Sequence, residues 1–458
     1  MKQDTIAAIA TAPGEAGIAI VRISGPNTYQ VADAVFRGPG TPPSRRRAFT
    51  FAHGHVVDAA GGHIDEVLML FMRAPHSYTG EDQVEIQGHG GSVSCQRILR
   101  RVLDAGARLA DPGEFTQRAF LNGRMDLVQA EAVLDLIKAR SERAAKAAVK
   151  QLDGSISDSL SNLYTNCMSA HADLEATMDF PEDELPEAVL DDIIRRLDGV
   201  KKDTDALLST WHDGRMLREG ALIVIAGRPN AGKSTMMNAL LGQDRAIVSD
   251  IPGTTRDTIE EGYLLNGIPL RLVDTAGIRE SDSEIEREGI RRSRAQLEQA
   301  DAVLYLIDSS TGITQADENN LADIDPKKVL VVFNKIDLPG ERKTNKALPG
   351  HFEFVEVSLR DRQHISKIRD SIAKLLGANY RQGADQQAVI SERHRQILMA
   401  FKAELETAAE LVISKKENHI SLASSHLRES LECLGTAVGK TYHHELLNSI
   451  FSRFCIGK

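Results

Sequence analysis

Residues 221–235 read A-L-I-V-I-A-G-R-P-N-A-G-K-S-T, and this stretch decides the fold of the chain around it. The apolar run at 221–226 is typical of a buried strand, and a helix is predicted to begin at Lys233. The loop between them, bounded by Gly227 and Gly232, has the spacing G-x-x-x-x-G-K-S. In a strand–loop–helix context this spacing indicates a phosphate-binding loop, because the glycines let backbone N–H groups point at phosphate and the helix N-terminus adds partial positive charge.

Two side chains of this loop predict its chemistry. Lys233 can reach the terminal phosphates of a nucleotide, and the hydroxyl of Ser234 can ligate a magnesium ion. The alternative is a chance glycine turn before a surface helix. The further nucleotide-binding motifs downstream make this alternative negligible. Strands and helices alternate over residues 216–380, as a parallel sheet demands, and we therefore predict an α/β P-loop domain there.

Two motifs after the loop predict a magnesium-linked switch. An apolar strand at 270–273 ends in D-T-A-G, where Asp274 can hold a magnesium-bound water and sense the γ-phosphate. Between the two motifs lies D-I-P-G-T-T-R-D at residues 250–257, and a threonine in such a loop can close over the magnesium ion.

Two later motifs predict which base is bound. The strand at 329–333 delivers N-K-I-D, in which Asp337 can accept hydrogen bonds from both N–H donors of guanine. Adenine lacks this donor pair, so GTP is predicted. Backbone N–H groups of the segment 355–359 can meet the guanine oxygen. The predicted GTP-binding residues are Asn230, Ala231, Gly232, Lys233, Ser234, Thr235, Ser249, Asp250, Ile251, Pro252, Gly253, Thr254, Thr255, Asp274, Thr275, Ala276, Gly277, Asn334, Lys335, Asp337, Ser358 and Leu359.

One position departs from the common GTPase pattern. Ile278 follows Gly277, where Ras-like proteins carry a glutamine that positions the attacking water. Because isoleucine can neither orient water nor stabilise charge, this function must come from elsewhere. The candidates are the acidic run at 280–288, an arginine from a partner, or a cation beside the phosphates, for which Asn230 offers a side-chain oxygen.

The composition limits the class of protein. The 458 residues correspond to about three domains, and 42% hydrophobic and 26% charged residues are typical of a soluble globular protein. Neither an apolar run of about 18 residues nor an apolar leader is found, so a cytoplasmic protein without a membrane span is predicted. At a net charge of −10, RNA binding would need a local basic face or a partner. The widely separated cysteines, which predict no disulfide framework, are Cys95, Cys167, Cys433 and Cys455.

The first 120 residues predict a mixed α+β domain. Short apolar or alternating strands are expected at 18–22, 67–71 and 83–87, and a helix at 92–103. The glycine-rich G-H-G-G at 88–91 is interpreted as a turn, with a structural role for its histidine.

The remaining sequence is helical on both sides of the α/β segment. Apolar residues recur at helical spacing between 121 and 215, and again after about 385. The economical interpretation is a nucleotide domain inserted into one helical domain. The predicted domains are 1–120, 121–215 (first helical part), 216–380 (GTP-binding) and 381–458 (second helical part).

Motifs spread along the chain also resemble a known family. They are D-T-I at 4–6, T-G-E-D at 79–82, G-H-G-G at 88–91, P-G-E-F at 112–115, R-A-F-L at 118–121, G-T-T-R-D at 253–257 and F-C-I-G-K at 454–458. Over its full length the sequence resembles the bacterial tRNA-modification GTPases of the MnmE (TrmE) family. The resemblance implies an N-terminal domain similar to folate-binding domains of one-carbon transfer enzymes, through which two chains form a homodimer.

The resemblance also implies an activity. Family members act with the flavoprotein MnmG, in a heterotetramer, to add an aminomethyl or carboxymethylaminomethyl group at C5 of the wobble uridine (position 34) of certain tRNAs. The carbon comes from 5,10-methylene-tetrahydrofolate, for which 5-formyl-tetrahydrofolate is a bound analogue. GTP, magnesium and potassium ions are the other implied cofactors.

The family's functional positions fall on identifiable residues of this sequence. The implied magnesium ligands are Ser234 and Thr255, and the implied potassium ligands are Asn230, Ser249, Ile251 and Thr254. Glu286 stands at the position of the water-orienting catalytic glutamate. The implied folate-binding residues are Arg22, Glu85, Arg124 and Lys458, although Arg124 replaces a familiar lysine.

Two alternatives stay open from the sequence. The chain could instead be a GTP-operated switch that assembles RNA or a ribosome and carries out no one-carbon chemistry. Cys455, near the C-terminus, is either a nucleophile toward the uridine or a packed terminal thiol.

Overall fold

The computed structural model describes residues 4–179, 187–242, 262–274, 297–338, 352–379, 389–414 and 416–458. The chain divides into two compact units. The first comprises Met1–Leu134, Gln151–Asp198 and Ala400–Lys458, and the second comprises Asp135–Lys150 and Gly199–Met399. The four domain ranges predicted from the sequence stay a prediction.

The N-terminal segment of the first unit forms a seven-stranded sheet in the order β3-β4-β5-β6-β2-β1-β7. Its strands are β1 (Ile6–Ile9), β2 (Ala16–Ser24), β3 (Phe36–Arg37), β4 (Thr50–Val57), β5 (His63–Met72), β6 (Gln83–Gly90) and β7 (Arg108–Leu109). The pairing of β1 with β7 is parallel, and the other pairs are antiparallel.

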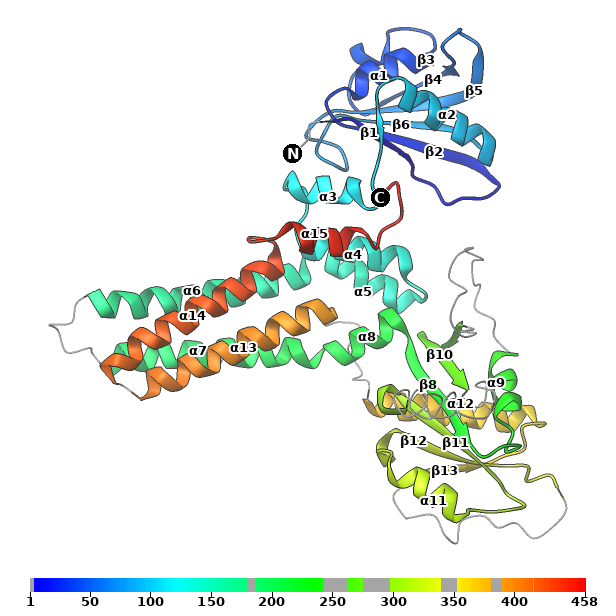
Figure 1. Cartoon of the computed structure of the whole chain (residues 1–458), viewed down its shortest axis with the longest axis vertical. Coiled ribbons are helices and arrows are strands. Elements are labelled where there is room, and N and C mark those ends of the chain that lie inside the picture. Colours follow the sequence, from blue (N-terminus) through cyan, green and yellow to red (C-terminus); the bar gives the residue numbers. More distant parts are fainter. Residues whose placement is uncertain are drawn as a thin grey trace, which may run out of the picture. The chain divides into compact units, whose positions relative to one another are not determined.

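Two helices, α1 (Thr28–Val35) and α2 (Ser92–Asp104), pack on this sheet (Figure 1). Alternate residues of the strands face them, since Val84 and Ile86 of β6 are fully buried with Ile98 of α2. The strands and the helix expected in this segment are therefore confirmed, with longer strands than the sequence indicated.

The turn expected at residues 88–91 is wrong. Gly88 and Gly90 lie inside β6, which pairs with β2 up to Gly90. A Cβ atom on Gly90 would lie 2.1 Å from the carbonyl oxygen of Ala16. Gly90 thus allows close approach of β2, whereas a Cβ atom on Gly88 would lie 2.7 Å from Oδ2 of Asp65, and neither glycine reverses the chain.

Helices make up most of the described chain outside the two sheet-containing segments, and they are divided between the two units. The helices outside the two sheet-containing segments are α3 (Glu114–Leu121), α4 (Leu127–Lys138), α5 (Glu142–Leu152), α6 (Ser155–Asp179), α7 (Glu187–Ser209), α8 (Trp211–Glu219), α13 (Glu392–Ile413), α14 (Glu417–Val438) and α15 (His444–Phe451). Helices α6 and α14 pack along one another although they are distant in sequence. The predicted helical runs on both sides of the α/β segment are thereby confirmed.

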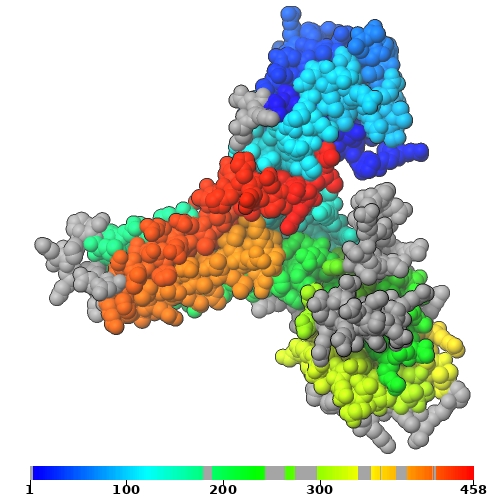
Figure 2. All heavy atoms as spheres, in the orientation of Figure 1, coloured from blue at the N-terminus to red at the C-terminus, as the bar shows by residue number. Residues whose placement is uncertain are grey.

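The C-terminal residues return to the N-terminal sheet. Helix α15 packs on α3 and α4 through a cluster that includes Phe120, Leu127 and Phe451. Figure 2 shows the red C-terminal residues against the cyan residues of α3. Gly457, at φ +98°, lies so close to β1 that a Cβ atom there would be 2.2 Å from the carbonyl oxygen of Ile9. The tail is thus packed in place where chain ends are usually frayed.

The second unit contains a six-stranded sheet in the order β13-β12-β11-β8-β10-β9. Its elements are β8 (Ala221–Gly227), α9 (Lys233–Leu241), β9 (Gly262–Leu265), β10 (Ile268–Asp274), β11 (Ala302–Asp308), α11 (Gln315–Ala322), β12 (Val329–Asn334), β13 (Glu353–Glu356) and α12 (Arg362–Asn379). All pairs are parallel except that of β9 with β10.

Helices cover both faces of this sheet (Figure 1). Helices α9 and α12 share one apolar cluster with β8, and α11 contributes to the cluster on the other face. The predicted P-loop architecture is confirmed, with one antiparallel edge strand that the sequence did not indicate. Among the described residues, no helix has the length and apolar character needed to cross a membrane.

Candidate functional site

The loop between β8 and α9 needs glycine at both of its ends. Gly227 has φ +133°, and a Cβ atom on it would lie 2.3 Å from the carbonyl oxygen of Leu306 on β11. Gly232 has φ +107° at the N-cap of α9, and a Cβ atom there would lie 2.4 Å from Nδ2 of Asn334. Both glycines of the sequence pattern are therefore required by backbone conformation and by space.

Lys233 is folded over this loop. Its side chain is buried, and Nζ donates hydrogen bonds to the carbonyl oxygens of Gly227, at 2.8 Å, and Arg228, at 3.0 Å. These bonds hold an ammonium group at the mouth of the helix N-terminus, where an anion is already favoured by the helix dipole.

Asn334 ties three loops together. Its Nδ2 donates to the carbonyl oxygen of Ala231, at 2.9 Å, and its Oδ1 accepts from the backbone N–H of Leu359, at 3.3 Å. Its own carbonyl oxygen accepts from the hydroxyl of Ser309, at 2.7 Å. The phosphate-binding loop and the two loops that carry the predicted base contacts are thus held by one buried amide.

Asp337 is kept ionised at the rim of the same cavity. Its pKa is lowered, first by the hydrogen bond from the side chain of Ser358, and the guanidinium of Arg360 lies 3.7 Å from its Oδ2. Lys335 adopts φ +67° and directs its Nζ to Oδ2 of Asp308, at 2.7 Å. An ionised carboxylate can only accept hydrogen bonds, as the predicted contact with the guanine N–H groups requires.

These groups surround a cavity of about 720 Å³. It is lined by Pro229, Asn230, Gly232, Lys233, Ser234, Thr235, Asn334, Lys335, Asp337, Leu338, Ser358, Leu359 and Arg360. The sequence analysis missed three of these residues. Pro229 lies inside the phosphate-binding loop, and Leu338 and Arg360 each follow a predicted base-binding motif. Ala231 is not part of the lining, but its carbonyl group is held by Asn334.

Several predicted residues lie outside the described part of the chain. They are Ser249, Asp250, Ile251, Pro252, Gly253, Thr254, Thr255, Thr275, Ala276, Gly277 and Glu286. Asp274 ends β10, where it pairs with Ile225, and its side chain is outside the description.

A second group of predicted residues meets in the first unit. Arg22 and Glu85 face each other across β2 and β6, and Nε of Arg22 donates to Oε1 of Glu85 at 2.9 Å. Nη1 of Arg22 lies 3.5 Å from the carbonyl oxygen of Gly457. Lys458 is held at the same place, since its carbonyl oxygen accepts from the N–H of Phe115 at 3.2 Å, and its pKa is lowered, first by burial and then by the positive charge of Arg22.

Aromatic rings and one unpartnered oxygen complete this second group. The guanidinium of Arg22 lies 5.2 Å from the ring centre of Tyr78 and 5.6 Å from that of Phe115. Gln83 donates from Nε2 to Glu85, at 3.3 Å, while its buried Oε1 has no hydrogen-bond partner among the described residues.

Arg124 and Cys455 stand at the margin of this group. Arg124 donates from Nε to the carbonyl oxygen of Ser77, at 3.0 Å. Ser77 directly precedes Tyr78, whose ring lies beside Arg22. Cys455 is exposed, so the structure does not show the packed terminal thiol that was one of its two interpretations.

The motifs that carry the family resemblance include a structural ion-pair network. The partly buried guanidinium of Arg118 donates to Asp4, at 2.7 Å, and to Glu114, at 2.8 Å, and also contacts Glu81, at 3.2 Å. Arg108 pairs with Asp4 and Glu114 as well. These residues join the first strand to α3, and the sequence alone offered no signal that its separate motifs meet.

Comparison with known proteins identifies relatives of the whole chain. A family model described as the GTP-binding protein TrmE N-terminus matches residues 5–124, and one described as the MnmE helical domain matches residues 127–455. The tRNA modification GTPase MnmE of Carboxydothermus hydrogenoformans is 43% identical over 465 residues, covering 100% of both chains. The protein of the same name from Moorella thermoacetica is 43% identical over 470 residues, again covering 100% of both.

Among solved structures, Aquifex aeolicus Era bound to GDP and aluminium fluoride matches 40% of this chain and 66% of its own, with 24% identity and a TM-score of 0.25. That similarity is too low to add to the description of the fold. The two family models and the full-length relatives show that the chain belongs to the MnmE family of tRNA modification GTPases.

Proposed function

We propose that this chain hydrolyses GTP as part of tRNA modification. Its relatives are named for this role. The observation that carries the proposal is the buried side chain of Asn334, which joins the phosphate-binding loop to the backbone of Leu359. These bonds hold the predicted phosphate-binding and base-binding residues around one cavity. Its volume of about 720 Å³ suits a nucleotide.

The residues that line the cavity fit GTP and magnesium. The ammonium of Lys233, now bonded to two loop carbonyl oxygens, would exchange these partners for phosphate oxygens. Asp337 would accept from guanine, and the Ser234 hydroxyl would be a magnesium ligand together with Thr255. When bound, magnesium would neutralise charge that develops on the phosphates.

A potassium ion is our proposal for the charge stabilisation that Ile278 cannot supply. Asn230 lines the cavity at φ +63°, and Ser249, Ile251 and Thr254 would complete the site, with Glu286 orienting the attacking water. Turnover should be at least about 10²-fold faster in potassium than in sodium at equal ionic strength, and Asn230→Ala should abolish the difference. Equal turnover of the wild type in the two salts would exclude the site.

Glu286→Ala should lower turnover by about 10²-fold with little change in GTP affinity, and an unaltered rate would remove it from the mechanism.

The second group of residues fits a reduced folate. A pterin ring presents donors and acceptors that Glu85 and the unpartnered Oε1 of Gln83 could meet, while Arg22, Arg124 and Lys458 supply positive charge. Methylene-tetrahydrofolate would supply the one-carbon unit for C5 of the wobble uridine. The exposed thiol of Cys455, three residues before the end of the tail, is a candidate for contact with the uridine.

We further propose the assembly that the family resemblance implies. Two chains would form a homodimer through their N-terminal segments and act on tRNA with the flavoprotein MnmG in a heterotetramer. Exposed apolar side chains on the N-terminal segment, such as Phe51, at 68%, and Phe49, at 69%, would be covered in such a dimer. The four free cysteines suit the reducing cytoplasm where we place the protein.

Nucleoside analysis of tRNA tests this function against the alternative of a GTP-operated assembly switch. Cells that lack the gene should lose the C5 group of the wobble uridine, and the wild-type gene should restore it. Loss of ribosome assembly with unchanged wobble nucleosides would favour the switch and exclude the proposed function.

A further inference from the structure

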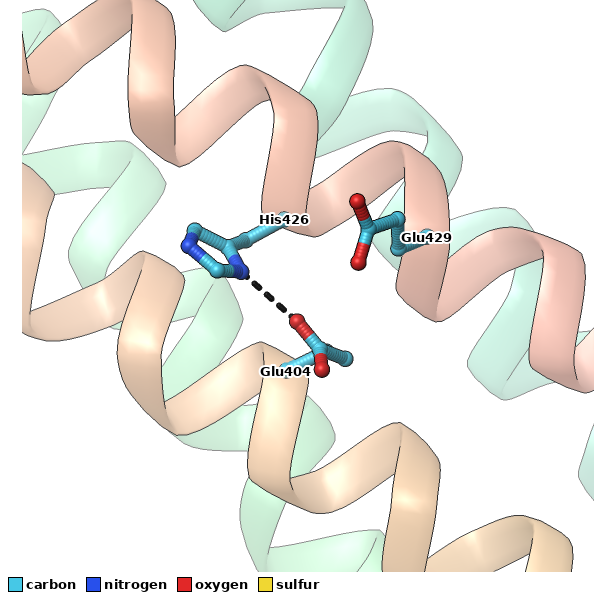
Figure 3. Close-up of side chains that lie close together, drawn as sticks. All are labelled: Glu404, His426 and Glu429. Atoms are coloured by element: carbon cyan, nitrogen blue, oxygen red, sulfur yellow. Dashed lines mark hydrogen bonds and ion pairs between the residues drawn. The ribbon is translucent and has the colours of Figure 1, made fainter.

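Glu404, His426 and Glu429 point into one space between two helices (Figure 3). Glu404 lies on α13, whereas His426 and Glu429 lie one turn apart on α14. Residues at this spacing share a helix face, so the backbone places both side chains toward α13. One potential ligand atom of each side chain lies within 4.8 Å of those of the other two. None of the three belongs to the cavity or to the folate-like group described above.

The negative charge of this cluster is not neutralised by basic side chains. In the part of the chain that the structure describes, Glu404 bonds to Nδ1 of His426 at 2.6 Å, and neither glutamate pairs with a lysine or arginine. The pKa of the neighbouring Cys433 is raised, first by burial and then by the charges of Glu404, Glu432 and Glu429. A third carboxylate therefore adds to the same field, and a cation would relieve it.

The donor atoms favour a particular class of cation. Magnesium and calcium take oxygen ligands, whereas one imidazole nitrogen with two carboxylate oxygens suits zinc and its transition-metal neighbours. Metal sites of this kind are built from side chains on facing helices. Glu404 and His426 are 32% and 33% exposed, which leaves room for water as a further ligand.

The geometry needs only a small adjustment. Zinc bonds of about 2.0–2.2 Å put tetrahedral ligand atoms roughly 3.4 Å apart, somewhat closer than the present upper limit. Glu429 is exposed and can rotate inward, and bonds from the metal to Glu404 and His426 would replace the hydrogen bond between these two side chains.

We propose that Glu404, His426 and Glu429 bind a divalent transition-metal ion, of which zinc fits best, and that this ion links α13 to α14. The proposal goes beyond GTP hydrolysis and tRNA modification, and it does not depend on either. The bound ion would hold the two long helices in register. Among these three residues, the helices are now joined by one hydrogen bond, between His426 and Glu404.

Calorimetric titration of zinc chloride into the full-length protein tests the site. The buffer should be non-chelating and near neutral pH, with magnesium and GDP present so that the nucleotide cavity is filled. Wild-type protein should bind zinc at this site, and Glu429→Gln and His426→Gln should each weaken that binding by at least about 10-fold. Because Glu429 is exposed, its variant keeps the test valid even if His426→Gln folds poorly.

Glu432→Gln is the matched control, because it removes the same charge from an exposed position of α14 without removing a proposed ligand. Its zinc affinity should fall by much less than that of Glu429→Gln, because Glu432 adds to the local negative charge but supplies no ligand atom. Equal weakening by Glu432→Gln and Glu429→Gln would show general surface attraction and overturn the proposal, as would wild-type affinity in Glu429→Gln. Cobalt binding gives an independent check, since the visible absorption of four-coordinate cobalt should appear in wild-type protein and be lost in Glu429→Gln.

Discussion

At the scale of a single residue, we propose that Asp337 selects the nucleotide. Its carboxylate is held ionised by Ser358 and can accept from two guanine donors. Asp337→Asn turns one acceptor into a donor, so GTP affinity should fall by at least about 10-fold and xanthosine triphosphate should become the preferred ligand. Equilibrium binding of GTP, ATP and xanthosine triphosphate measures this.

Arg360→Ala is the companion variant for that measurement. It removes the guanidinium beside Asp337 but leaves both acceptor oxygens in place, so GTP should remain preferred. Unchanged GTP preference in Asp337→Asn would show that this carboxylate does not select the base.

Asp4 makes a pH-dependent contribution to stability. Hydrogen bonding from Arg108 is the largest cause that lowers its pKa from 3.8 to about 2, and Arg118 lowers it further against the opposing effect of burial. Because the folded pKa is depressed, the stabilisation is fully present above pH 3.8 and is lost as the pH falls through about 2.

Asp4→Asn should therefore reduce the free energy of unfolding at neutral pH by about 1–3 kcal/mol. The gap between variant and wild type should stay constant down to about pH 5 and then close in more acidic solution. Urea unfolding at a series of pH values measures the gap. A difference that persists undiminished at about pH 3 would contradict the assignment.

At the scale of an element, the turn into α9 depends on Gly232. A Cβ atom there would both strain the backbone at φ +107° and collide with the amide of Asn334. Gly232→Ala should therefore weaken GTP binding by at least about 10-fold, because it separates the phosphate-binding loop from the base-binding loops.

Gly377→Ala is the control in the same unit. Gly377 lies in α12 with nothing near the position of a new Cβ atom, and alanine should stabilise this helix by up to about 1 kcal/mol. GTP affinity that is equal in the two variants would show that the conformation at Gly232 is not needed.

Elements were predictable where their signal is local. The apolar run of β8 and the glycines beside it decide strand, loop and helix within fifteen residues, and the structure has all three. The glycines at 88–90 failed as a turn signal because glycine also serves close strand approach, and only the position of Ala16 distinguishes the two uses.

At the scale of the whole molecule, contacts between distant segments could not be predicted. Asn334 was expected to contact the nucleotide, yet its role in holding Ala231 and Leu359 depends on three separate loops meeting. Arg118 and Asp4 are 114 positions apart, and nothing in either motif specifies a partner. The meeting of Arg22 with Glu85 and the tail followed from the family resemblance, since residue spacing alone does not bring them together.

The C-terminal tail links the two ends of the chain. The N–H of Phe115 donates to the carbonyl oxygen of Lys458, at 3.2 Å, and Gly457 lies against β1. We propose that one chain carries two ligand sites, a GTP cavity in the second unit and a folate site in the first unit that the tail completes.

Removal of residues 455–458 tests that claim most directly. Calorimetry of the shortened protein should show binding of 5-formyl-tetrahydrofolate weakened by at least about 10-fold, because Lys458 and the carbonyl of Gly457 are lost from beside Arg22. GTP hydrolysis, measured on the same preparation, should persist at the wild-type rate. Undiminished folate affinity in the protein without its tail would contradict the account.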